Sequence, residues 1–173
     1  MNIQNQTPTE GADWIPSPPS VKSGMYDVMF GEGAAVYHNK KEGNPGVSIG
    51  IPGVIFDAHE VENRDEIDRP YTTFIIHTKK NGDKFDGGEN QFALLLQSTG
   101  LADDFNKKFA AYEKPFDIPV DEMIEWVQLK FPAKRVCYTL EQKYNKVMDR
   151  LETNPVHVQA ISTGTNVDSS DLA

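Results

Sequence analysis

Three short segments of the chain each combine lysine or arginine with an aromatic residue. They are Tyr37, Lys40 and Lys41; Lys79, Lys80, Lys84 and Phe85; and Lys143, Tyr144, Lys146 and Arg150, the last near Lys134 and Arg135. Lysine and arginine neutralise phosphates, and an exposed aromatic ring stacks on a nucleic-acid base for about 1–3 kcal/mol. If the fold brings the segments to one side, these residues would form a binding surface for single-stranded nucleic acid. Taken singly, each segment also fits an ordinary solvated turn.

The sequence lacks the common motifs of catalytic and metal sites. It contains no GxxxxGK[ST], HExxH or CxxC pattern. The four histidines are scattered without metal-ligand spacing: His38, His59, His77 and His157. Cys137 is the only cysteine, so we expect a buried thiol, no disulfide and no cysteine metal site. The sequence therefore predicts a protein without catalytic residues, cofactor or bound metal.

Composition and charge narrow the class of protein. The chain has 173 residues and a net charge of −9, which argues against indiscriminate binding to phosphates. The segment Val127 to Arg150 nevertheless carries six basic and two acidic residues. No run of about 18 apolar residues occurs, and the first residues do not resemble a signal peptide. We expect a cytoplasmic protein that does not span a membrane.

The first basic segment is expected to connect two strands within Ser23 to His59. Tyr26, Val28 and Phe30 alternate with more polar positions, the pattern of a half-buried strand. A second apolar alternation follows the loop and changes phase at Pro52-Gly53. Such a phase change is typical of a bulge, which lets a strand curl around a small barrel.

The middle of the chain predicts one more strand and then helices. We expect a strand over Tyr71 to Thr78, a tight turn at Asn81-Gly82, and a short return strand at Phe85 that Gly87-Gly88 ends. The expected helices cover Asn90 to Ser98, Leu101 to Tyr112, and one turn over Asp121 to Val127.

The segment Thr139 to Glu152 fits two structures. Leu140, Tyr144 and Leu151 share a helical face, and Thr139 with Gln142 matches a capping box. Strand-like alternation before Lys143 and after Lys146 instead favours a hairpin. We favour the hairpin, mainly because of the family resemblance described below.

The expected organisation is one domain between two polar tails. Residues 1–20 are rich in proline and predict a flexible arm, with Trp14-Ile15 docked on the body. Residues 21–161 form the domain, with a helical insertion at about 90–127, and residues 162–173 form a disordered acidic tail. In that tail, Asp168, Asp171 and Leu172 would bind a partner or the protein's own basic groove. The alternative is a polar terminus with no partner.

The order of these segments resembles the single-stranded DNA-binding proteins of tailed bacteriophages. The shared features are Gly24-Met25-Tyr26-Asp27-Val28, a Lys/Gly hairpin, Ser98-Thr99-Gly100-Leu101, Lys143-Tyr144-Asn145-Lys146, and an acidic tail. The resemblance covers roughly residues 22–161. This chain departs from it in a long insertion from Ala102 to Glu125 and in a tail ending Leu172-Ala173, without an aromatic residue.

The resemblance implies a mainly β fold, an OB-like five-stranded barrel with helical insertions. It further implies largely sequence-independent binding and protection of single-stranded DNA during phage replication or recombination, without catalysis. The tail would then contact replication or recombination proteins in the host cytoplasm. Two alternatives remain: a virion or assembly β-barrel protein whose tails bind neighbouring subunits, and a metal-dependent enzyme using the carboxylates of Asp57 to Asp68.

Overall fold

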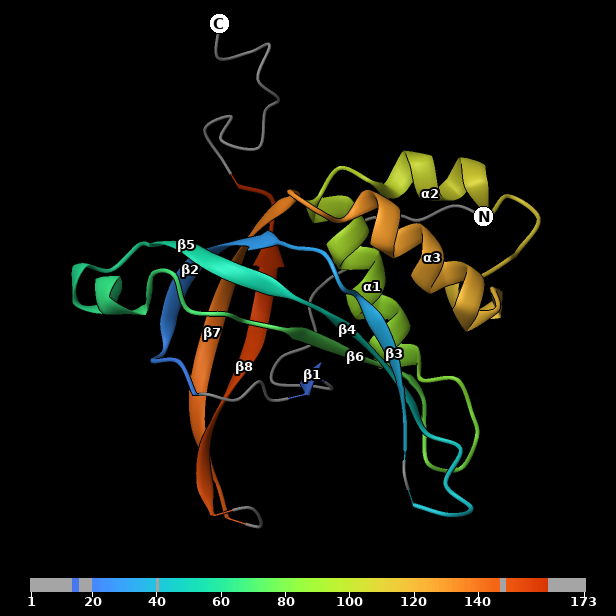
Figure 1. The fold of residues 1–173 in the computed structure, drawn as a ribbon, viewed down its shortest axis with the longest axis horizontal. Coiled ribbons are helices and arrows are strands. Elements are labelled where there is room, and N and C mark those ends of the chain that lie inside the picture. Colours follow the sequence, from blue (N-terminus) through green and yellow to red (C-terminus); the bar gives the residue numbers. More distant parts are fainter. Residues whose placement is uncertain (1–13, 16–19, 40, 147–148, 162–173) are drawn as a thin grey trace, which may run out of the picture.

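Two antiparallel four-stranded sheets form the body of the protein. The structure is a computed structural model that describes residues 14–15, 20–39, 41–146 and 149–161. Sheet A has the order β1 (Trp14–Ile15), β6 (Thr73–Thr78), β4 (Val47–Ile51), β3 (Ala35–His38) (Figure 1). Sheet B has the order β5 (Gly53–Ala58), β2 (Gly24–Phe30), β7 (Arg135–Asn145), β8 (Arg150–Gln159). The predicted mainly β class is confirmed.

The strand pair predicted over Ser23 to His59 contributes to both sheets. Its first half is β2 followed by β3, and its second half is β4 followed by β5. β2 pairs with β5 in sheet B, whereas β3 pairs with β4 in sheet A. The break at Pro52 was predicted, but the break between Phe30 and Ala35 was not. Because both halves bend, one long hairpin joins the two sheets.

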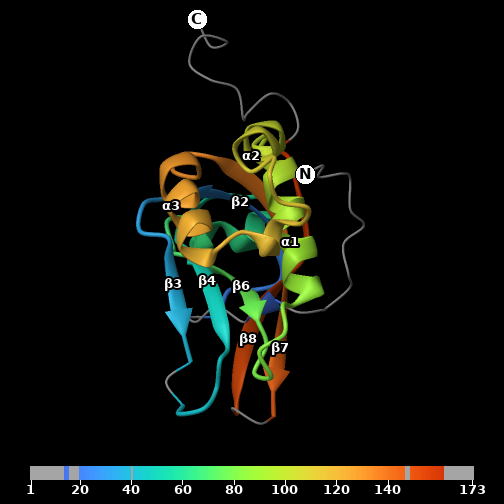
Figure 2. The ribbon, with the colours of Figure 1, turned by 90° about the vertical axis from the view of Figure 1, so that its right-hand side faces the viewer.

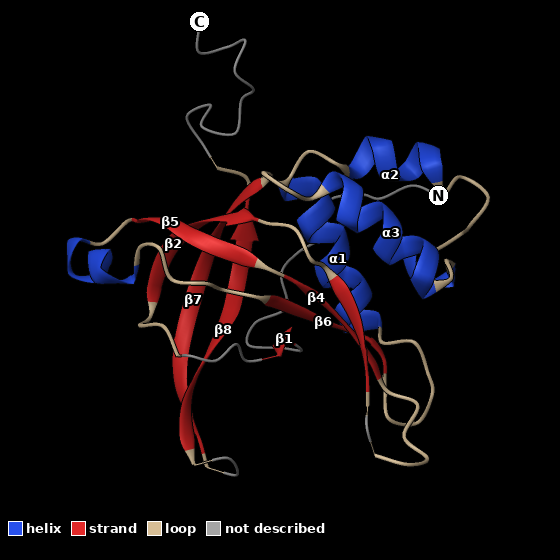
Figure 3. Ribbon diagram, in the orientation of Figure 1, coloured by secondary structure: helices blue, strands red, loops and turns tan. Residues whose placement is uncertain are grey.

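Helices fill the chain between β6 and β7 and lie together on one side of the molecule (Figure 3). They are α1 (Asp86–Ser98), α2 (Ala102–Lys108) and α3 (Val120–Lys130), with a short 3-10 helix at Pro115–Asp117. A second 3-10 helix, Val61–Glu66, lies apart from them, between β5 and β6. Aromatic side chains hold α1, α2 and α3 to the sheets: Phe92, Phe105 and Phe131 are fully buried. The rings of Phe92 and Phe105 meet edge to face at 5.5 Å between centroids. This aromatic cluster continues the apolar core contributed by Tyr26, Val28 and Ile49.

The helices differ from the sequence-based prediction in their bounds. α1 begins at Asp86, so Gly87-Gly88 lies inside a helix and does not end a strand. The expected return strand is reduced to one bridge between Thr78 and Lys84. A Cβ atom on Gly88 would overlap the backbone carbonyl of Ile76, so the glycine is needed where α1 crosses β6. The helical part therefore spans residues 86–130 and not 90–127, and its last helix has three turns where one was predicted.

The segment Thr139 to Glu152 is a hairpin, which was the favoured alternative. β7 and β8 pair in antiparallel fashion from Cys137 opposite Gln159 to Asn145 opposite Arg150. Tyr138, Leu140 and Val158 are buried against the core from this hairpin. The helical alternative is wrong because the two-residue period, continued into β8, places the apolar side chains on the core face.

The N-terminal arm reaches sheet A at one point. Trp14 pairs with Ile75 and Ile15 with Phe74, as expected for a docked segment. The rest of residues 1–19 and the whole predicted tail, including Asp168, Asp171 and Leu172, lie outside the described residues. Across residues 14–15, 20–39, 41–146 and 149–161, no helix has the length and apolar character that a membrane span requires.

Candidate nucleic-acid interface

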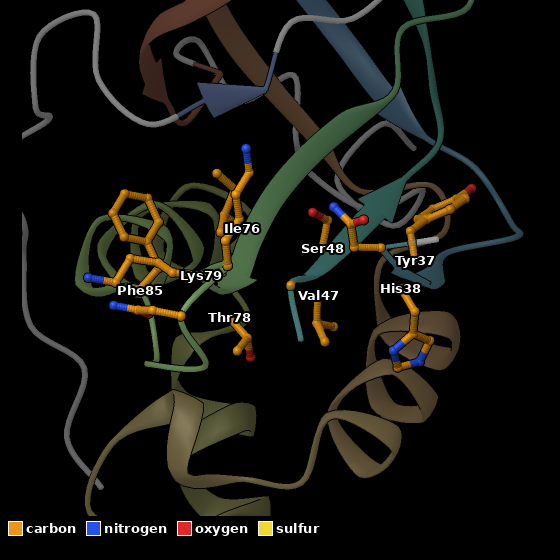
Figure 4. Close-up of a pocket in the computed structure, with 12 residues that line it drawn as sticks. Tyr37, His38, Val47, Ser48, Ile76, Thr78, Lys79 and Phe85 are labelled. Carbon is orange, nitrogen blue, oxygen red and sulfur yellow. The ribbon is translucent and has the colours of Figure 1, made fainter. Parts of the chain in front are cut away.

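A groove of about 610 Å³ lies on sheet A and the loop that follows β6. The residues that line it come from β3, β4, the ends of the loop between them, β6 and the segment 79–85. In the close-up view, Tyr37 and Phe85 lie on opposite sides, with Val47 and Thr78 between them (Figure 4). Tyr37 of the first predicted segment and Lys79, Lys80 and Phe85 of the second therefore reach the same groove, although they are about 40 residues apart in the sequence.

Tyr37 is positioned by the strand neighbours of β3. Its side chain is 49% exposed, and its ring meets Phe74 edge to face at 5.6 Å between centroids. Between these two rings lies Gly50 of β4, where a Cβ atom would be 2.6 Å from Tyr37 Cε2 and 3.0 Å from Phe74 Cε1. The missing side chain at Gly50 therefore lets the Tyr37 ring lie across β4. About half of the Tyr37 surface stays exposed to solvent.

The opposite wall is fixed by backbone hydrogen bonds in the turn after β6. The Gly82 amide donates to the Lys79 carbonyl at 2.9 Å, and the Lys79 amide donates to the Asp83 carbonyl at 2.8 Å. Gly82 has φ 93°, the left-handed conformation that glycine favours, so the predicted Asn81-Gly82 turn is confirmed. The Phe85 amide donates to the His77 carbonyl at 3.0 Å, which holds Phe85 beside the end of β6.

Two lysines of the groove, Lys79 and Lys80, make its rim basic, while Lys84 follows in the same turn and Lys41 lies in the loop between β3 and β4. All four are exposed and form no ion pair with another residue that the structure describes. Lys40 falls outside the described residues. Beneath the rim, burial lowers the pKa of His77 to about 4, and the charge of Lys84 acts in the same direction. His77 is therefore neutral near pH 7, and the positive charge of this region comes from the lysines.

The third predicted segment, at the tip of β7 and β8, lies at the same end of the molecule as the other two turns (Figures 1 and 2). Its polar groups are largely engaged with acidic neighbours. Lys143 Nζ is 3.3 Å from Glu141 Oε1, and Arg150 Nε donates to Glu152 Oε1 at 3.0 Å. The Tyr144 hydroxyl donates to the carboxylate of Asp149. Lys146 is exposed beside them.

Lys134 and Arg135 are not brought to the groove. They lie at the start of β7, whose 11 residues separate them from the hairpin tip. At about 3.3 Å per residue, that strand is roughly 36 Å long. The Arg135 guanidinium lies 5.2 Å above the ring centroid of Phe56 in β5, a cation–π contact on sheet B. Sequence proximity to the third segment was therefore misleading for these two residues.

One group of side chains with metal-binding donors escaped the sequence analysis. Asp27, His59 and Cys137 place one donor atom each within 4.8 Å of one another. His59 and Cys137 are 32 and 110 residues from Asp27 along the chain, so no short spacing motif could reveal them. The acidic neighbours that the sequence suggested are otherwise engaged or exposed: Glu60 accepts the Met25 amide at 3.0 Å, and Asp57 is exposed.

The groove combines the contacts that an unpaired nucleic-acid strand needs. Its aromatic walls can stack on bases, and its lysines can neutralise the phosphates on either side. Comparison with family models, curated proteins and solved structures gives no significant match to this chain.

Proposed function

We propose that this protein binds single-stranded DNA through the groove on sheet A, without strong sequence preference. The observation that carries the proposal is the meeting of Tyr37, Phe85 and the Lys79-Lys80 pair around one groove. Stacking tolerates any base because every base has a flat face, and lysines contact the phosphates that all sequences share. The chemistry of this groove therefore supplies affinity with little sequence discrimination.

The strand pairing supports an OB-like barrel. If β2 with β3 is its first strand and β4 with β5 its second, then β6, β7 and β8 are its third, fourth and fifth. OB folds bind oligonucleotides on the face of strands two and three, between the loops that join strands one to two and four to five. In this chain that face carries the groove, and those loops are the two basic hairpin tips.

The proposed role is to cover and protect single-stranded DNA in replication or recombination, in the cytoplasm of a host cell if a phage encodes the protein. This role rests on the resemblance in sequence layout to phage single-stranded DNA-binding proteins. In the same proposal, Asp168, Asp171 and Leu172 contact a replication or recombination protein. The virion or assembly alternative has no observation in the groove that favours it.

Binding should depend strongly on salt because the protein as a whole is acidic. Four lysines surround the groove and its neighbouring turn: Lys41, Lys79, Lys80 and Lys84. If each neutralises one phosphate of a single strand, the logarithm of the binding constant falls with the logarithm of salt concentration with a slope of about −3. A salt-independent affinity would contradict the phosphate part of the proposal.

The test is a titration of a labelled oligothymidine, followed by fluorescence anisotropy at several salt concentrations. Lys79→Ala/Lys80→Ala should weaken binding and make the slope shallower by about 1.4. The matched control is Lys107→Ala/Lys108→Ala, a second adjacent and exposed lysine pair at the end of α2. The control should bind like the unmodified protein. Equal slopes for the two double variants, or no binding at low salt, would overturn the proposed groove.

A further inference from the structure

Three side chains from neighbouring strands of sheet B converge at one point. Asp27 of β2 lies directly opposite Cys137 of β7, and His59 follows the end of β5. His59 Nε2 is 2.8 Å from Asp27 Oδ1 and 3.8 Å from Cys137 Sγ. The amide of His59 donates to the Met25 carbonyl at 2.9 Å, which keeps the residue in line with β2. The backbone of the sheet thus fixes all three positions.

This arrangement does not fit a nucleophile–histidine–carboxylate relay. In such a relay the carboxylate contacts Nδ1 of the imidazole while the nucleophile contacts Nε2. Here the carboxylate and the thiol both face Nε2 of His59. Convergence of three donor atoms on one point is instead what a metal ion requires.

We infer that Asp27, His59 and Cys137 form a zinc site. Zinc takes thiolate sulfur at about 2.3 Å and imidazole nitrogen or carboxylate oxygen at about 2.0–2.2 Å, in tetrahedral geometry. Tetrahedral ligands at those lengths lie about 3.4–3.6 Å apart, so the observed pairs at 2.8 and 3.8 Å would change by about 0.6 and about 0.2 Å, and the third pair already lies within 4.8 Å. The Cys137 proton passes to solvent when the thiolate binds the ion.

Burial around the site matches a zinc ion that enters from one side. Asp27 and Cys137 are 8% and 2% exposed, whereas the His59 side chain is 40% exposed. Gln159, opposite Cys137 on β8, hydrogen bonds to its sulfur. Such outer contacts orient metal ligands. The exposed imidazole leaves an entry path, and a water molecule takes the fourth coordination position. A bound zinc ion would link β5, β2 and β7 of sheet B. The groove lies on sheet A, so an experiment that contradicts one proposal leaves the other unaffected.

The experiment is a titration of the full-length, tag-free protein with Co²⁺, which reports a thiolate ligand by its charge-transfer absorption and a four-coordinate site by intense visible bands. We expect one Co²⁺ per chain, displaced by Zn²⁺. Cys137→Ser should abolish the charge-transfer band. Asp27→Asn and His59→Gln should each weaken binding by about tenfold or more. The matched control is His38→Gln, an exposed histidine of sheet A, which should bind like the unmodified protein.

His59→Gln is the decisive variant because it alters a partly exposed side chain and should leave the fold intact, as circular dichroism will show. Absence of a thiolate-to-cobalt band in the unmodified protein would overturn the zinc site. Unchanged affinity in His59→Gln would overturn it as well. An equal loss of affinity in His38→Gln would show that the ion binds elsewhere, which also removes the assignment.

Discussion

Two hairpins that look alike in sequence differ in how their charged groups are used. Both carry a tyrosine among lysines near a turn, and both tips lie at one end of the molecule. Beside the β3–β4 hairpin, Tyr37 lies across Gly50 and the lysines of the groove have no described acidic partner. At the β7–β8 tip, Lys143, Tyr144 and Arg150 each contact an acidic residue of the same hairpin.

The difference shows that basic and aromatic composition alone does not define a binding surface. An exposed ion pair contributes little to stability, about 0–1 kcal/mol, but it lowers the net charge that a phosphate meets. The groove leaves its positive charge available, whereas the β7–β8 tip balances most of its own. We therefore expect the first region to dominate DNA binding and the second to modulate it.

The largest expected difference in DNA affinity comes from replacing each of the two tyrosines with alanine. Tyr37→Ala should weaken binding to oligothymidine by about 1–3 kcal/mol, the value of one stacked base. Tyr144→Ala should cause a much smaller loss because its hydroxyl is bound to Asp149 within the hairpin. Anisotropy titration measures both, and Tyr37→Phe, which keeps the ring, serves as the control. Equal losses for the two alanine variants would show that both hairpins stack on DNA.

An effect of intermediate size is expected on the free energy of unfolding at acidic pH. The pKa of His77 is about 4 in the folded protein, below its ordinary value of 6.5, mainly because the side chain is buried. Between these values the unfolded chain binds a proton that the folded chain does not. The free energy of unfolding should therefore fall as the pH drops from about 6.5 to about 4.

The contribution of the β7–β8 tip to the free energy of unfolding should change only at lower pH. Hydrogen bonds from Asn145, and then from Arg150, hold the pKa of Glu152 below its ordinary 4.5, so its contribution is lost only below that value. Urea unfolding at a series of pH values measures both effects. His77→Phe, which keeps a ring against Phe116, should flatten the dependence above pH 4.5, whereas Glu152→Gln should not. An unchanged slope in His77→Phe would contradict this assignment.

The smallest effect is expected when the β7–β8 tip is freed of an acidic group. Glu152→Gln removes the charge that pairs with Arg150 and keeps one acceptor oxygen, where the carboxylate accepts from Asn145 with one oxygen and from Arg150 with the other. The salt dependence of oligothymidine binding should become steeper by at most about 0.7, the share of one phosphate. A gain larger than the loss caused by Lys79→Ala/Lys80→Ala would reverse the ranking of the two regions.

Short-range sequence patterns correctly predicted most of the strands, helices and turns. Alternation around Tyr26 and Ile49 identified strands, Asn81-Gly82 identified a turn, and Gly100, at φ 76°, ends α1 as expected. Each of these signals acts within a few residues of the chain, so sequence alone carries it. Gly88 misled the prediction because its reason lies in a contact with Ile76, which only the packed structure reveals.

The candidate sites required tertiary information. Tyr37 and Phe85 were named as separate candidates, but nothing in either segment indicates that they face one another. Asp27, His59 and Cys137 meet only because the register of β2 and β7 sets Asp27 opposite Cys137. A shift of one residue in that register would point one of these side chains into the core.

The close contact of α1 with β6 has a consequence for the thermodynamics of binding. Gly88 lets the helix rest on the backbone of Ile76, and three backbone hydrogen bonds hold the turn from Lys79 to Phe85. The groove is therefore shaped before any ligand arrives. A preformed site loses little conformational entropy on association, so few contacts suffice for useful affinity. Replacing Gly88 with a larger residue would loosen this support and raise the entropic cost of binding without altering any residue that touches the ligand.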